Sequence, residues 1–254
     1  MQTTELTEAK ESKLKKFLDT SFAPLEKFRD EAPGTYKHCQ NVAGMCEAIS
    51  NALNMDSDLI ICAALYHDIG KMAYPLAFSE NQNGSGNIHN EIDPLLSYHI
   101  ITRHVGDGVN ILLDIKDMPR EVIEIVSQHH GSTVLRMFMN KAKSTNVSEW
   151  RYKCRPPQTT EAAILMIADS VEATARSYYG NGKLNTDEER KDLVSSTIER
   201  LIDDGQLDEM KIGIVKVIKR ILNKELGNMF HKREVYPDDE DSLKIKDEDE
   251  EKEK

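Results

Sequence analysis

The chain has 254 residues, 39% of them hydrophobic, which is enough for one large domain or two small ones with a sizeable core. No apolar run is long enough to span a bilayer and the N-terminus is polar, so we expect a cytoplasmic chain with no membrane segment. The net charge of −11 argues against a nucleic-acid duplex as a partner, although −6 of it lies between Asp238 and Lys254.

Apolar residues at helical spacing, with no hairpin signal, predict an all-α fold in a single helical bundle domain. The expected helices are, in chain order, 11–28, 36–53, one capped by Asp56 or Ser57 that runs to the His67–Asp68 pair, 95–104, 109–113, 119–130, 161–177, 184–203 and 207–230. We expect Thr35 to cap the second helix and Gly70 to end or bend the third. The Gly106–Gly108 stretch is expected to interrupt the helix that starts at Leu95 or to begin a new turn.

The chain divides by composition into three parts. Residues 1–30 form a charged leader with one helix, residues 31–237 form the main domain, and the acidic residues 238–254 form a disordered tail. Two long loops are expected in the main domain, at 75–94 and 140–160. Long loops in compact domains are often lids or binding segments.

Seven candidate metal ligands fall on five predicted helices, often near a helix end: His38, His67, Asp68, His104, His129, His130 and Asp169. Side chains from facing helices can hold metals in a bundle core. Five imidazoles and two carboxylates suit Fe, Mn, Co or Zn better than Ca. The four cysteines show no C-x-x-C pairing, so we interpret them as reduced structural thiols.

Each candidate also has an ordinary structural explanation. A lone histidine such as His38 is more often a surface or core residue than a ligand. Asp169, however, follows an apolar helical run, and a buried carboxylate needs a cation or several donors. Adjacent helical side chains such as His67 and Asp68 diverge by roughly 100°. They do not form a simple pair on one ion, but Asp68 has a second oxygen that can reach a second ion.

The order of these residues and their surroundings resemble the HD-domain metal-dependent phosphohydrolases. The match is similar in detail to the cytosolic domain of the seven-transmembrane, PgpH-type subgroup, which hydrolyses cyclic di-AMP. The segments that carry the resemblance are 31–38, Tyr66-His-Asp-Ile-Gly-Lys71, 80–82, 104–109, Gln128-His-His-Gly131, Ala168-Asp-Ser-Val-Glu-Ala173, 204–208 and 231–237. No Gly-Tyr-Pro follows the histidine doublet, which argues against the cyclic di-GMP branch.

The resemblance implies an HD-type bundle with a dinuclear metal site in its core, holding two divalent transition-metal ions, Fe or Mn. The first metal would take His38, His67, Asp68 and Asp169, and the second would take Asp68, His104, His129 and His130. Asp68 would bridge the two ions, which together would activate a water for attack on phosphorus. We interpret Asp68 and Lys71 as catalytic, and Lys71, His89 and Arg176 as substrate contacts. The alternatives are a solvated Lys71, a plain loop His89, and an Arg176 that pairs with Glu172 at helical spacing.

Two loop segments depart from the subgroup. Its usual Gly-Pro-Lys-Pro-Gln appears as Cys154-Arg-Pro-Pro-Gln158, and its Asn-Pro-His-Asp appears as Asn87-Ile-His-Asn90. Both departures fall in loops that we expect to face the substrate, so they bear on the choice of substrate more than on the chemistry.

The sequence therefore predicts a metal-dependent phosphodiesterase that opens cyclic di-AMP, a small-molecule nucleotide, to linear pApA. Three alternatives stay open: a phosphohydrolase for another nucleotide or phosphoester, a metal-holding module that binds a nucleotide without turnover, and a di-iron oxygenase. The sequence also leaves open whether the chain forms a homodimer, and whether Met1 is a natural start or the start of a fragment.

Overall fold

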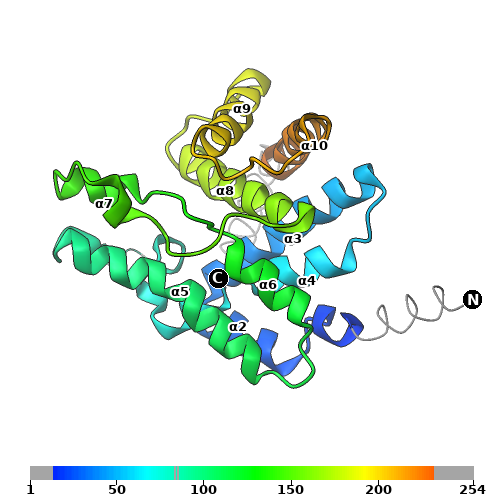
Figure 1. The fold of residues 1–254 in the computed structure, drawn as a ribbon, viewed down its shortest axis with the longest axis horizontal. Coiled ribbons are helices and arrows are strands. Elements are labelled where there is room, and N and C mark those ends of the chain that lie inside the picture. Colours follow the sequence, from blue (N-terminus) through cyan, green and yellow to red (C-terminus); the bar gives the residue numbers. More distant parts are fainter. Residues whose placement is uncertain (1–13, 83, 85, 232–254) are drawn as a thin grey trace, which may run out of the picture.

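The computed structural model describes residues 14–82, 84 and 86–231, and these form an assembly of helices (Figure 1). The α-helices are α2 (Ala23–Glu31), α3 (Pro33–Leu53), α4 (Asp58–Tyr66), α5 (Pro94–Asp114), α6 (Arg120–Gln128), α7 (Arg136–Lys141), α8 (Thr160–Gly180), α9 (Asp187–Asp203) and α10 (Ile212–His231). Within the described ranges there is no strand, only an isolated bridge between Val134 and Arg151. The all-α prediction is confirmed.

Helices α3, α4, α6 and α8 pack together at the centre of the domain. The middle of α8 is apolar on almost every side, and residues 162–169 are all buried. Helix α3 contacts both α4 and α8, and α9 and α10 cover the outer side of α8 (Figure 1). A helix that is apolar all round has to be surrounded by other helices. Asp169, at the end of this apolar run, is therefore carried into the interior.

The leader differs from the single helix expected over 11–28. Residues 14–18 are helical, the chain then turns at 19–22, and α2 follows. Phe17, Leu25 and Phe28 are fully buried in the same core as the central helices. Residues 14–31 thus pack as part of the main core. The tail expected at 238–254 and the motif residues 232–237 lie outside the described residues, so the three-part division stays a prediction.

Two local predictions were wrong for identifiable reasons. Helix α3 begins at Pro33, not after Thr35, because proline is well suited to the first helical position. Thr35 instead binds the loop, since its backbone N–H donates to Asn81 Oδ1 at 3.1 Å. Helix α5 runs unbroken through Gly106–Gly108. A helix-interior glycine costs only about 1 kcal/mol relative to alanine, which packing overrides.

The predicted loops contain short ordered elements. The 3-10 helix η1 (Ile69–Ala73) precedes the first, which holds η2 (Pro75–Ala77), η3 (Ser79–Asn81) and η4 (Ile88–Asn90). The second was expected from 140 to 160, but the sequence missed α7 just before it and η5 (Val147–Trp150) within it. Tyr98, Phe138 and Trp150 form a small separate core between α5, α7 and η5.

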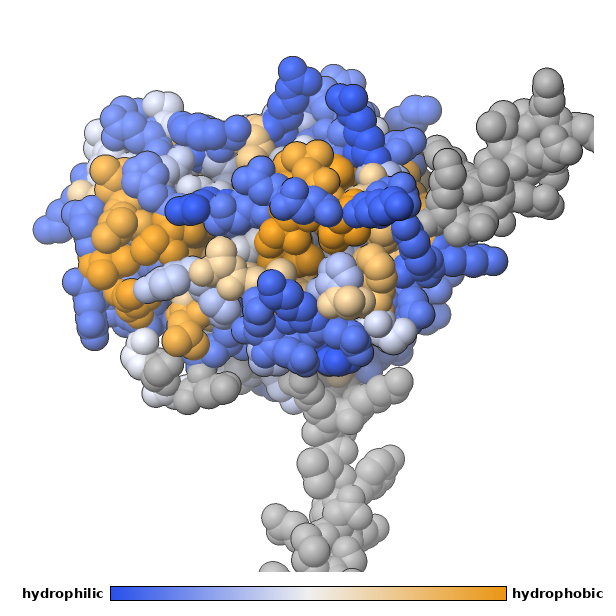
Figure 2. All heavy atoms as spheres, turned by 90° about the horizontal axis from the view of Figure 1, so that it is seen from below, coloured by the Kyte–Doolittle hydropathy of each residue, from blue (hydrophilic) through white to orange (hydrophobic). Residues whose placement is uncertain are grey.

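The surface carries apolar groups among many charged side chains, as one face of the molecule shows (Figure 2). Helix α5 contributes Leu95, Leu96 and Leu113, each about half exposed or more. None of the described helices is long and apolar enough to cross a membrane.

Candidate metal centre

The fold brings all seven predicted ligand residues into one cluster. His38 lies on α3, His67 at the C-terminal end of α4, and His104 in the middle of α5. His129 ends α6, His130 follows it, and Asp169 lies on α8. All are buried except His130, whose side chain is 22% exposed. Two groups of candidate ligand atoms share Asp68: His38 with His67, and His104 with His129 and His130.

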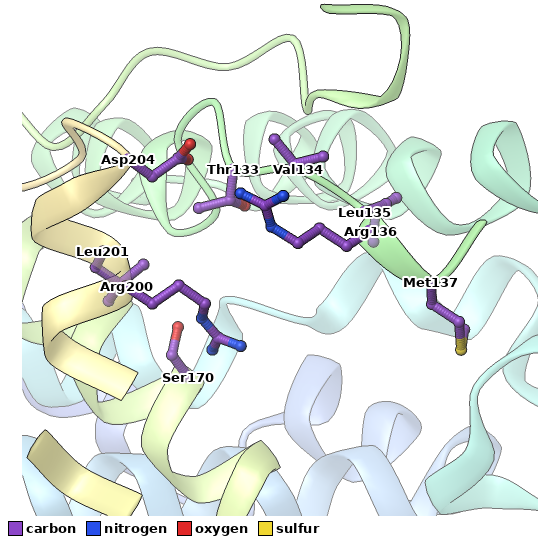
Figure 3. A pocket seen from close by; sticks show the side chains of 9 residues that line it. All are labelled: Thr133, Val134, Leu135, Arg136, Met137, Ser170, Arg200, Leu201 and Asp204. Atoms are coloured by element: carbon purple, nitrogen blue, oxygen red, sulfur yellow. The ribbon is translucent and has the colours of Figure 1, made fainter. Parts of the chain in front are cut away.

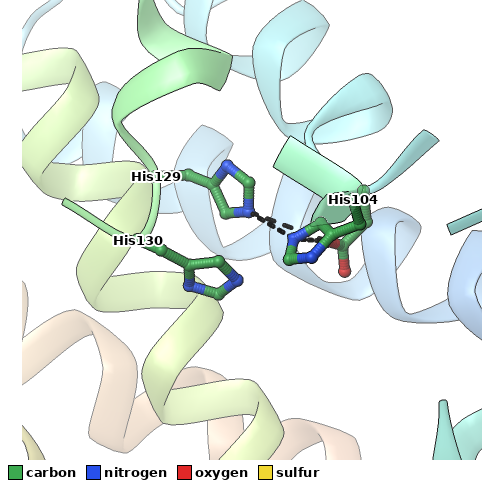
Figure 4. Close-up of side chains that lie close together, drawn as sticks. His104, His129 and His130 are labelled. Carbon is green, nitrogen blue, oxygen red and sulfur yellow. Dashed lines mark hydrogen bonds and ion pairs between the residues drawn. The ribbon is translucent and has the colours of Figure 1, made fainter. Parts of the chain in front are cut away.

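Asp68 faces the two groups with different oxygens. Its Oδ2 lies 3.3 Å from His67 Nε2 and 3.6 Å from His38 Nε2. Its Oδ1 lies 3.2 Å from His104 Nε2 and 3.7 Å from His129 Nε2. The rings of His104 and His129 turn their Nε2 atoms toward each other, 3.3 Å apart, with His130 beside them (Figure 4). One carboxylate therefore lies between two sets of imidazole nitrogens.

Asp169 also extends across the cluster. Its Oδ1 is 3.0 Å from His38 Nε2 and 3.7 Å from His67 Nε2. Its Oδ2 is 3.7 Å from His130 Nδ1. Asp169 thus lies mainly against His38 and His67, the group to which the sequence analysis assigned it. Its second oxygen also approaches His130, the partly exposed histidine of the other group.

Local hydrogen bonds orient three of the rings. The Nδ1–H groups of His67, His104 and His129 each donate to the carbonyl three residues earlier, at 2.8, 2.5 and 2.6 Å. A neutral imidazole that donates through Nδ1 has its lone pair on Nε2. These bonds therefore turn the three Nε2 atoms into the cluster, as the outer hydrogen bonds of metal-binding histidines do.

Two buried atoms lack a hydrogen-bonding partner at this point. His67 Nε2 and Asp68 Oδ1 are buried and accept no hydrogen bond. Buried polar atoms are normally paired. A lone pair on nitrogen and an anionic oxygen left in this way fit a divalent cation.

The charges of the cluster have clear causes. Burial opposes ionisation of Asp68, but the cation of Lys71 and the neighbouring His67 hold the pKa of Asp68 well below its usual range. Burial also opposes protonation of His38, but hydrogen bonds to Asp169 and Glu172 raise its pKa to about 10. Burial and the charge of His129 push the pKa of His130 far down. Against the effect of its burial, the neighbouring Asp68 and Asp169 likewise raise the pKa of His67 well above its ordinary value. A metal must therefore compete with a proton at His38 and at His67, and finds His130 already neutral.

Glu172 contacts the cluster, although the sequence analysis named it only as a partner of Arg176. Its Oε2 accepts a hydrogen bond from His38 Nδ1, and its Oε1 accepts one from Asn41 Nδ2 at 2.9 Å. His38 is the ring in the first group that has no backbone carbonyl on Nδ1, so Glu172 takes that role. The sequence does contain a signal for this contact, because Glu172 lies one helical turn after Asp169 in the segment 168–173 that carries the family resemblance.

Lys71 and Glu80 form a buried ion pair at the edge of the cluster. Lys71 Nζ lies 2.7 Å from Asp68 Oδ2 and 2.9 Å from Glu80 Oε1. Burial opposes its charge, but both carboxylates raise the pKa of Lys71. The same ion pair lowers the pKa of Glu80 to about 2 against the effect of its burial. The interpretation of Lys71 as a solvated surface residue is therefore wrong.

The other two predicted substrate contacts lie differently. Arg176 Nε is 3.5 Å from Glu172, and its Nη1 is 3.7 Å from Glu80, so it borders the cluster with a side chain that is 38% exposed. His89 is buried in the loop, where its Nε2 donates to the Ala77 carbonyl at 2.8 Å and its ring packs on Phe138. Those contacts favour a structural role for His89.

The sequence matches the family model described as "HD domain" over residues 35–174. The chain belongs to the HD domain family. All seven cluster residues lie in the matched range, and the HD domain fold accounts for a His/Asp cluster that binds divalent metal.

Two relatives of this HD domain are named for the same activity. The Cyclic-di-AMP phosphodiesterase PgpH of Listeria monocytogenes is 38% identical over 236 residues, which are 91% of this chain and 32% of that protein. The Bacillus subtilis protein of the same name is also 38% identical, over 84% of this chain and 30% of its own length. This HD domain thus spans about a third of the length of the relatives it matches.

Solved structures agree with the fold. The PgpH HD domain of L. monocytogenes superposes with a TM-score of 0.77 at 37% identity, covering 82% of this chain and 99% of that one. The same domain in complex with cyclic di-AMP gives a TM-score of 0.78 at 36% identity, covering 84% and 100%. The predicted HD-type bundle is confirmed.

Proposed function

We propose that this HD domain is a metal-dependent phosphodiesterase that opens cyclic di-AMP to linear pApA. A water oxygen forms a bond to one phosphorus while the bond to the 3′ oxygen breaks. The product then carries a 5′-phosphate and a 3′-hydroxyl. The relatives named for this activity and the neighbour solved with cyclic di-AMP support the choice of substrate.

The observation that carries the proposal is the position of Asp68 between two sets of imidazole nitrogens. We propose two divalent ions, Fe or Mn, with His38, His67, Asp68 and Asp169 holding the first and Asp68, His104, His129 and His130 holding the second. When bound, such ions supply a water of lowered pKa and neutralise charge on the phosphoryl oxygens. The donor set of imidazoles and carboxylates suits these borderline metals.

The chain's own residues have defined tasks around that centre. Lys71 stays protonated at neutral pH, so it serves as a fixed cation for a phosphate oxygen and not as a general base. Arg176, which borders the cluster, can bind a second phosphate oxygen. Tyr152 stacks on His130, with ring centroids 4.4 Å apart, and shields the partly exposed imidazole from water. His89 stays a predicted substrate contact, but the contacts described above give it no part here.

A product assay tests the proposal. Chain loaded with Mn or with Fe is given cyclic di-AMP, cyclic di-GMP and a panel of linear nucleotides, with Asp68→Ala as the inactive variant. We expect pApA from cyclic di-AMP with the loaded wild type and none from Asp68→Ala. Cleavage of another phosphoester with cyclic di-AMP left intact would replace the substrate. Binding without product over hours would indicate a binding module, and a strict need for oxygen would indicate an oxygenase. The cytoplasmic location and the homodimer stay predictions.

A further inference from the structure

A cavity lies beside the metal centre. It has a volume of about 300 Å³ and lies between α8, α9 and the segment that follows the histidine doublet (Figure 3). Its lining residues are Thr133, Val134, Leu135, Arg136, Met137, Ser170, Arg200, Leu201 and Asp204. None of these residues belongs to the proposed ligand sets.

Two arginines extend into this cavity from opposite sides. Arg136 comes from the start of α7 and Arg200 from near the end of α9, with the guanidinium of Arg136 beside Thr133 and that of Arg200 beside Ser170 (Figure 3). Among the residues that the structure describes, no carboxylate oxygen lies within ion-pair distance of either guanidinium, and the two face the same hollow. The chain has a net charge of −11, so two unpaired cations facing one hollow need an explanation.

The nearest acid does not neutralise them. Asp204 is held by Arg151, with Nη2 2.7 Å from Oδ1 and Nη1 3.0 Å from Oδ2. The adjoining hollow is lined by Glu199 and Asp203 as well. Glu199 forms an ion pair with Lys219 at 3.1 Å. Within the described part of the chain, Asp203 is then the one exposed acid of that hollow with no ion-pair partner. The cavity therefore keeps a net positive charge.

The lining chemistry matches a phosphate carried by a nucleotide. Guanidinium groups bind phosphate oxygens through paired N–H donors. Ser170 supplies a hydroxyl, and Val134, Leu135 and Met137 supply an apolar wall for a sugar or base. The volume is at the lower end of the range for ligand pockets, which fits one nucleotide unit better than a whole dinucleotide.

The cavity shares its walls with the metal centre. Thr133 Oγ1 donates to the His130 carbonyl at 2.8 Å, and Ser170 directly follows Asp169. Arg151 Nη1 also donates to the Ser132 carbonyl at 2.6 Å, so the same framework holds the cavity and the histidine doublet.

We propose that Arg136 and Arg200 form a phosphate-binding site for a nucleotide, separate from the metal ligands. The phosphate belongs either to the half of the substrate that is not being cleaved or to a free nucleotide. Binding at this site does not depend on the proposed function, whereas assigning it to the substrate does.

The test uses ADP as the probe and the full, metal-loaded chain. Isothermal titration compares wild type, the double variant Arg136→Gln/Arg200→Gln, and Arg120→Gln, which removes an exposed arginine elsewhere. We expect ADP binding to weaken on the order of tenfold or more in the double variant and to be unchanged in Arg120→Gln. Both arginines are exposed, so the variants should keep the melting temperature of wild type. If ADP instead binds at the metal ions, all three proteins give the same isotherm.

Kinetics with cyclic di-AMP show whether the phosphate bound at this site comes from the substrate or from a free nucleotide. A raised KM with unchanged kcat in the double variant assigns the phosphate to the substrate. An unchanged KM together with weakened ADP binding assigns it to a free nucleotide. Equal ADP affinity in wild type and the double variant, or an equal loss in Arg120→Gln, overturns the site, whether or not the chain hydrolyses cyclic di-AMP.

Discussion

Gly70, just after the His67–Asp68 pair, packs directly against the backbone of α5, and replacing it with alanine should push the two segments apart. A Cβ at position 70 would lie 2.0 Å from the His104 carbonyl oxygen and 2.4 Å from Gly108 N. Both are backbone atoms, so no side-chain rotation relieves the clash. Reaching an ordinary contact of 3.4 Å needs a movement of 1.4 Å. That movement would carry His104 Nε2 away from Asp68 Oδ1, now 3.2 Å apart.

The expected loss of folding stability in Gly70→Ala follows from overpacking. Forcing one extra carbon into a closed contact costs about 1–3 kcal/mol. In a domain of this size that lowers the melting temperature by roughly 2–12 °C. Misplacing a reacting group by about 1 Å can cost on the order of a hundredfold in rate. We therefore expect a large loss of rate in Gly70→Ala together with only a moderate drop in its melting temperature.

Two neighbouring glycines of α5 provide graded controls. A Cβ at Gly108 would lie 3.3 Å from Gly70 N, a milder contact, and one at Gly106 would meet nothing within 4 Å. Gly106→Ala should stabilise the helix by about 0.5–1 kcal/mol. Thermal melts and initial rates on the metal-loaded proteins should rank damage as Gly70→Ala, then Gly108→Ala, with Gly106→Ala undamaged. A Gly70→Ala protein as stable and as active as Gly106→Ala would refute the reasoning.

Three further predictions concern the cluster. Glu172→Gln should weaken metal binding about 10–100-fold and also lower the melting temperature of the metal-free chain, because it removes the carboxylate that holds His38; equal affinity in a metal titration would contradict this. Lys71→Met should destabilise the metal-free chain by about 3–5 kcal/mol, since buried Asp68 and Glu80 lose their cation; added metal should restore more stability to this variant than to wild type in paired melts. The raised pKa of His38, about 10, means its protonated form stabilises the metal-free fold fully below about pH 6.5 and is lost as pH rises through 10. Metal must displace that proton, so apparent affinity should rise with pH between 6 and 9, with proton release visible as buffer-dependent heat.

The ligand cluster could be predicted from the sequence because each member carries a chemical requirement of its own. A carboxylate at the end of the apolar run in α8 and a histidine doublet before Gly131 both need buried partners. The local spacing could not show which oxygen of Asp68 faces which histidines, since that depends on how α3, α5 and α6 cross. The unbroken course of α5 also depends on packing, because glycine signals alone favour an interruption at Gly106.

The cavity arginines show the limit of sequence reasoning more sharply. Arg136 and Arg200 are far apart in the chain, and each alone reads as an ordinary surface arginine. Their shared cavity exists because α9 packs on α8 while the segment after His130 crosses the same face. The contact between Gly70 and Gly108 is hidden for the same reason. Long-range approaches of this kind leave no periodic signal in the sequence.

The central claim is that Asp68 stands between two bound ions. Anomalous diffraction from crystals of the Mn- or Fe-loaded chain tests it directly. The account predicts two peaks, one beside Asp68 Oδ2 with His38, His67 and Asp169, and one beside Oδ1 with His104, His129 and His130. A single peak, or peaks away from Asp68, would contradict it.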